Sequence, residues 1–113
     1  MNIQIFGTKK SNDSKKAERF FKERGIRFQY IDMKEKGLSR GEFQSVLAAV
    51  GALDALIDPQ ARDREVLDLL PHLSSSDAED KVFENQQVLR LPIVRNGRQA
   101  TVGCQPDVWK TWE

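Results

Sequence analysis

Short stretches of alternating apolar and polar residues lie near both ends of the chain, and residues between them follow helical spacing. Residues 2–6 alternate, which predicts a strand that Gly7 ends. A helix is predicted from about Asp13 to Arg24. One side of this helix holds Ala17, Phe20, Phe21 and Arg24. Residues 27–31 predict a second strand, with Phe28 and Tyr30 on one face. The order of strand, helix and strand indicates a βαβ unit.

The middle of the chain is predicted to be helical. Ser39 and Glu42 form a capping box, and an apolar stripe follows at Phe43, Val46, Leu47 and Val50. Gly51 is expected to end this helix. A further segment is expected to open at Pro59 and to close at Pro71.

A second capping box is predicted at residues 76–79, at the start of a helix that presents Val82, Phe83 and Gln86. No flexible linker separates this region from the rest of the chain. We therefore expect residues 37–88 to form a helical insertion within a single domain, residues 1–113.

The last quarter of the chain predicts a β-hairpin and a helix. Residues 93–94 and 100–102 flank Asn96-Gly97, a strong signal for a two-residue hairpin turn. Pro106 is suited to the first position of a helix. That helix holds Trp109 and Trp112 on one face. The two rings are interpreted as core packing or, alternatively, as an exposed anchor for a partner.

Composition narrows the classes of function. The chain has 113 residues, of which 39% are hydrophobic and 31% charged, and a net charge of +1. This balance indicates no direct binding to nucleic acid or to membranes. No apolar run approaches the roughly 20 residues of a membrane span. We expect a cytoplasmic monomer. The basic cluster of Lys9, Lys10, Lys15 and Lys16 is interpreted as a solvated face or as an anion or partner site.

Cysteine and histidine each occur once, as Cys104 and His72. One cysteine allows no internal disulfide, and the pair cannot supply the four ligands of a structural zinc site, so no metal is expected. Cys104 is interpreted as a buried, inert thiol or as a replacement redox thiol. His72 is expected in a loop or at a helix end, without the spacing of a catalytic triad.

The order of these elements, together with Leu91–Val94 before the hairpin and Val102–Pro106 after it, resembles the arsenate reductase family. This family of thioredoxin-like proteins also contains the Spx-type transcription regulators. The resemblance covers essentially the whole chain and implies an α/β, thioredoxin-like fold with a four-stranded mixed sheet. The implied order is β-α-β, helical insertion, β-hairpin and α. Pro92 is implied to follow a cis peptide bond beside the active turn.

The catalytic residues of the family are not matched. The resemblance aligns the nucleophilic cysteine with Ser11 and the second thiol of two-cysteine switches with Ser14. The three arginines that hold the oxyanion in arsenate reductases align with positions occupied here by other residue types. These positions are Asp58, Leu91 and Gln105. A serine would need an adjacent base to act as a nucleophile.

Three interpretations of Ser11 stay open: a nucleophile, a polar contact to a ligand, or an N-cap in a degenerate site. Because helix N-termini attract anions, ligand binding is predicted near the first helix. The candidate ligand-binding residues are Thr8, Lys9, Lys10, Ser11, Asn12 and Pro92.

The resulting hypothesis is a redox-inactive, protein- or small-ligand-binding module of regulatory type, without a cofactor. By family analogy alone, RNA polymerase is a candidate partner. The alternative is a residual thiol-dependent oxidoreductase that uses Cys104 or an external thiol such as glutathione.

Overall fold

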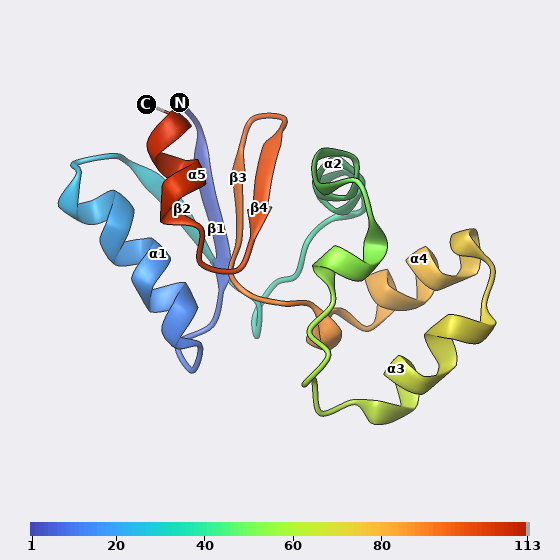
Figure 1. The fold of residues 1–113 in the computed structure, drawn as a ribbon. Coiled ribbons are helices and arrows are strands. Elements are labelled where there is room, and N and C mark those ends of the chain that lie inside the picture. Colours follow the sequence, from blue (N-terminus) through green and yellow to red (C-terminus); the bar gives the residue numbers. More distant parts are fainter. Residues whose placement is uncertain (113) are drawn as a thin grey trace.

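A four-stranded mixed sheet organises the chain in the computed structural model, which describes residues 1–112 (Figure 1). The strand order is β2-β1-β3-β4, in which β1 and β2 are parallel and the other neighbours are antiparallel. The strands are β1 (Ile3–Gly7), β2 (Phe28–Asp32), β3 (Ile93–Asn96) and β4 (Gln99–Val102). This is the thioredoxin-like α/β arrangement that the sequence predicted.

Helices cover both faces of the sheet. Figure 1 shows α1 and α5 on one side, and α2 with the remaining helices on the other. The helices are α1 (Asn12–Glu23), α2 (Arg40–Val50), α3 (Arg64–Leu69), α4 (Ser75–Glu84) and α5 (Pro106–Trp109). Four 3-10 helices lie among the described residues: η1 (Leu53–Leu56), η2 (Leu70–His72), η3 (Gln86–Val88) and η4 (Lys110–Trp112). No helix among residues 1–112 is long and apolar enough to cross a bilayer.

The strands send alternate side chains into two separate cores, because successive residues of a strand face opposite sides. The core under α1 and α5 contains Ile3, Ile5, Ala17, Phe21, Val94 and Trp109. Phe6 and Ile93 face the other way, into the core formed with α2 and the helices that follow it. The predicted apolar stripe of α2 is confirmed at Phe43 and Val46, both fully buried.

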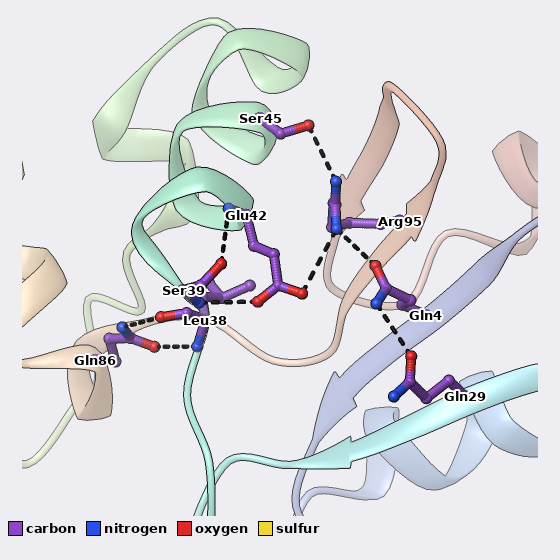
Figure 2. Close-up of polar contacts among 8 residues, drawn as sticks. All are labelled: Gln4, Gln29, Leu38, Ser39, Glu42, Ser45, Gln86 and Arg95. Carbon is purple, nitrogen blue, oxygen red and sulfur yellow. Dashed lines mark hydrogen bonds and ion pairs between the residues drawn. The ribbon is translucent and has the colours of Figure 1, made fainter.

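A polar network joins the sheet to α2 (Figure 2). The Arg95 guanidinium on β3 donates to Gln4 Oε1 at 2.6 Å and to Ser45 Oγ at 3.3 Å. It also lies 3.8 Å from Glu42 Oε2. Glu42 completes the predicted capping box, since its carboxylate accepts from the Ser39 backbone N–H. The helix start is therefore linked to the sheet through one side chain.

Two predicted helix starts are wrong. The helix expected to open at Pro59 begins at Arg64, because the Asp63 side chain accepts from the Val66 N–H and caps it. The second capping box is not at Ser76: α4 is capped by Ser74, whose hydroxyl accepts from the Asp77 N–H. Three consecutive serines offer similar caps in the sequence, and in the structure the first of them caps the helix.

The structure places two other predicted features at different residues. The hairpin turn is Gly97-Arg98, since Asn96 pairs with Gln99 and belongs to the strands. Gly97 has φ +60°, as the first central residue of a II′-type turn requires. Gln86 lies beyond α4, in η3, instead of on the face of that helix.

Candidate functional site

An open cleft of about 410 Å³ lies at the N-terminus of α1. Three separate parts of the chain line it: the start of α1, a residue that follows η1, and the segment before β3. The lining residues are Ser11, Asn12, Asp13, Asp58, Leu89, Arg90 and Leu91. The cleft therefore joins the predicted turn to the segment that precedes Pro92.

A short antiparallel bridge between Ile57 and Leu89 holds the far wall of the cleft. The Asp58 N–H donates to the Val88 carbonyl at 2.9 Å, and the Arg90 N–H donates to the Leu56 carbonyl at 2.8 Å. These backbone bonds fix Asp58 and Arg90 on opposite strands of the bridge, so both side chains reach the same cleft.

The peptide bond between Leu91 and Pro92 is cis. The Pro92 carbonyl accepts from the Gly103 N–H at 2.8 Å, which ties this bend to the end of β4. Pro92 itself is buried, and Leu91 in front of it contributes to the cleft wall.

Ser11 serves as the N-cap of α1. Its backbone is extended, and its hydroxyl accepts from the Ser14 N–H at 3.1 Å. This hydrogen bond satisfies one of the backbone donors that a helix start leaves unpaired. The Ser11 side chain thus stands at the cleft with its oxygen oriented by the helix.

Ser14 lies beneath the turn instead of in the cleft, and none of its surface is exposed. Its hydroxyl accepts from the Thr8 N–H at 3.3 Å and also bonds with the Tyr30 hydroxyl. Burial, followed by the charges of Glu18 and Asp32, raises the pKa of Tyr30, against the opposing effect of the Ser14 bond. Ser14 therefore joins the turn to the sheet.

The other candidate ligand-binding residues are distributed around the cleft. Asn12 lines it next to Ser11. Lys9 and Lys10 are exposed in the turn before α1 and are not among the lining residues. Thr8 lines a neighbouring hollow of about 570 Å³, which also includes Leu91. His72 lies exposed in η2, outside the cleft.

The cleft contains two charges that the sequence reasoning did not assign to it, those of Asp13 and Arg90, beside Asp58, which the family resemblance had aligned with an oxyanion position. Asp13 and Asp58 supply two carboxylates, and Arg90 supplies the single guanidinium among the lining residues. Asp13 also lies 3.8 Å from the Lys16 ammonium. In the sequence, the position of Arg90 two residues before Pro92 is the feature that could have indicated that Arg90 lines the cleft. The two carboxylates make this cleft less suited to an anion than a helix N-terminus alone would be.

Cys104 follows β4 and packs, half-buried, against the core under α1 and α5. Burial raises the pKa of its thiol, and the Asp13 carboxylate raises it further, while Lys16 acts in the opposite direction. A thiol in such surroundings is a poor nucleophile at neutral pH, because the thiolate is the reactive form.

Gln86 closes the hollow beside Thr8 by bonding to the backbone of Leu38 in both directions (Figure 2). Its Oε1 accepts from the Leu38 N–H at 2.8 Å, and its Nε2 donates to the Leu38 carbonyl at 3.0 Å. We expect Gln86→Leu to lower the free energy of unfolding by about 2 kcal/mol, since it leaves two backbone groups unpaired.

Urea denaturation measures this effect, and Gln87→Leu is the matched control. Gln87 is exposed and bonds to the side chains of Asp63 and Asn85, so its loss should cost about 0.5 kcal/mol. Equal losses for the two variants would contradict a bracing role for Gln86.

The parallel βαβ unit, the antiparallel hairpin and the cis-proline beside the α1 cleft define a thioredoxin-like protein with a helical segment between β2 and β3. No protein-family model matches the sequence, and no curated protein matches it either. Solved structures do match the fold over nearly the whole chain.

Three of these structures illustrate the similarity. An ArsC family related protein from Bacteroides fragilis has a TM-score of 0.87 and 16% identity, with 100% of this chain and 98% of that chain covered. Arsenate reductase from Vibrio cholerae has a TM-score of 0.82 and 22% identity, with 96% and 94% covered. The glutaredoxin-like NrdH-redoxin from Escherichia coli has a TM-score of 0.51 and 16% identity, with 100% and 96% covered. At sequence identities this low, the similarity to these structures shows a shared fold and no more.

Proposed function

We propose that this chain is a redox-inactive member of the arsenate reductase family that acts as a binding module of regulatory type. The fold supports the family, since arsenate reductase-like structures share the sheet and the helical segment. The bound molecule is a protein or a small ligand. The site residues support the loss of thiol chemistry.

The observation that carries the proposal is the role of Ser11. It stands at the head of α1, where the resemblance places the nucleophilic cysteine, and its hydroxyl caps the helix. A serine attacks only when a base removes its proton. His72, the one histidine of the sequence, lies in η2 and does not line the cleft. Because its hydroxyl accepts from the Ser14 N–H, Ser11 has the surroundings of a structural cap.

The oxyanion contacts of the family are also replaced. Asp58 brings a negative charge to the cleft, and its carboxylate accepts from the Gln60 N–H at 2.8 Å. Leu91 contributes an apolar side chain. Gln105, at the third position, donates to the Val102 carbonyl at 2.7 Å. Arsenate would meet one guanidinium, that of Arg90, against two carboxylates.

A residual oxidoreductase that uses Cys104 is the alternative. It draws on one observation: Cys104 is close enough to Asp13, at the cleft, for the two charges to interact. Burial first, and this interaction with Asp13 second, raise the pKa of the Cys104 thiol and lower its reactivity at neutral pH. The surroundings of Cys104 therefore favour the binding module over the enzyme.

An arsenate reduction assay with reduced glutathione and glutaredoxin separates the two functions. We expect no turnover above background for the wild type or for Cys104→Ser. Turnover that disappears in Cys104→Ser would establish the oxidoreductase and overturn the proposal. Turnover that persists in Cys104→Ser would place the chemistry on the external thiol and would equally overturn redox inactivity.

Ser11→Cys, made in a Cys104→Ser background, tests whether the scaffold still activates a thiol. We expect the introduced thiol to react with iodoacetamide at pH 7 roughly tenfold faster than Cys104 of the wild type, since a helix N-terminus lowers a thiol pKa. Arsenate turnover should stay absent, because the oxyanion contacts are still missing. Alkylation followed by mass spectrometry measures the rates, and equal rates would contradict a preserved thiol-activating turn.

A further inference from the structure

The net charge of +1 conceals a strong separation of charge. Residues 1–36 contain ten basic and five acidic side chains, whereas residues 37–88 contain four basic and ten acidic ones. Figure 1 shows α3 and α4 on the opposite side of the molecule from α1 and β2. The molecule is 44 Å long and at most 26 Å across, so the acidic helical part forms one end of an elongated body.

This acidic end carries a groove between η1, η2 and α4. Two adjoining hollows of about 480 and 430 Å³ form it, and they share lining residues from all three elements. Among the apolar residues that line the groove are Leu53, Ile57, Leu67, Leu70, Pro71 and Ala78. Pro71 is exposed, Ala78 is buried and the other four are half-buried against the core, so the groove presents part of this apolar surface to solvent.

Three carboxylates line this groove: Asp54, Asp68 and Glu79. None of them forms an ion pair within the part of the chain that the structure describes. The one cation on the groove, Arg64, donates to the Pro59 carbonyl at 2.7 Å. An apolar floor between uncompensated carboxylates matches a ligand with apolar side chains flanked by cations.

We propose that this groove docks a basic amphipathic segment of a protein partner, with leucine-like side chains on the floor and lysine or arginine against the three carboxylates. This inference rests on the proposed function and names the partner surface of the binding module. A second copy of the chain does not fit, because the lysine-rich α1 has its apolar side, Ala17 and Phe21, fully buried in its own core. Phe20, the other aromatic residue of α1, is half-buried against Trp109, so the helix presents no continuous apolar face beside its cations.

A fluorescein-labelled 14-residue peptide of leucine and lysine, patterned as an amphipathic helix, is a direct probe. We expect saturable binding to the full chain, with ¹⁵N amide shifts concentrated at Leu53, Leu70 and neighbouring groove residues. The triple variant Asp54→Asn, Asp68→Asn, Glu79→Gln should bind about tenfold more weakly at low salt, since each rim charge contributes modestly. A peptide with glutamate in place of lysine should not bind.

The matched control neutralises three carboxylates outside the groove, Glu18→Gln, Glu23→Gln and Glu35→Gln, and should leave the affinity unchanged. Amide shifts centred on the α1 cleft, or equal weakening by the two triple variants, would overturn the proposal. A further outcome is that the wild type self-associates and that the groove triple variant alone loses this association. This result would assign the groove to a second copy of the chain and would also overturn the proposal. The arsenate assay does not involve this groove. A negative result in the peptide-binding experiment can therefore be distinguished from arsenate turnover, which would contradict the proposed redox inactivity.

Discussion

Trp109→Ala is expected to lower the free energy of unfolding by about 4 kcal/mol, the range for truncating a fully buried aromatic ring. Trp109 is 1% exposed and packs between α1 and the sheet. Its ring centroid lies 5.2 Å from that of Phe20 and 5.4 Å from that of Phe21. Trp109 is the buried residue of the short helix α5, so its side chain anchors this helix to the core. Urea denaturation followed by circular dichroism measures the loss.

The Trp109 hydrogen bond can be separated from the packing. Its Nε1 donates to Thr101 Oγ1 at 2.7 Å in the interior. Trp109→Phe should cost less than truncation, and Thr101→Val should partly offset it, since both ends of the bond are then apolar.

Trp112→Ala is the matched control for Trp109→Ala on the same C-terminal segment. Trp112 is partly exposed, and its removal should cost about 1 kcal/mol. A Trp109→Ala protein as stable as Trp112→Ala would show that α5 does not depend on this side chain.

Gly7→Ala is expected to destabilise the protein by about 3 kcal/mol, the upper part of the range for an overpacked core. A Cβ atom on Gly7 would lie 2.5 Å from Ser14 Oγ, 2.7 Å from Ser14 Cβ and 3.0 Å from the Tyr30 hydroxyl. These distances are shorter than carbon and oxygen atoms tolerate, and Ser14 cannot withdraw because it belongs to α1. Thermal and urea denaturation report the change.

Two variants test this explanation of Gly7. Gly41→Ala, in α2, places a Cβ in open space and should stabilise the protein by about 0.5 kcal/mol, because alanine favours helices. Ser14→Gly removes both clashing Ser14 atoms, so Gly7→Ala should cost less in that background than in the wild type. A Gly7→Ala protein of wild-type stability would show that the turn can open without cost.

Only part of the candidate site could be predicted from the sequence. An N-cap was one of the three interpretations of Ser11 that the sequence left open, and the structure shows that cap. Asp58 and Leu91 entered through the family resemblance. Asp13 and Arg90 were missed, because the amino-acid sequence alone does not show which side chains line a cleft formed by distant segments.

Local signals in the sequence determined the βαβ unit, the capping box at Ser39 and Glu42 and the hairpin before the last helix, and the family resemblance carried by their order implied the thioredoxin-like fold. Such signals act over a few residues, where backbone propensity and hydrogen-bond geometry suffice. Tertiary structure alone brought Asp58 and Arg90 together across the Ile57–Leu89 bridge and buried Ser14 against Gly7. It also formed the acidic groove, because contacts between distant segments depend on how whole elements pack.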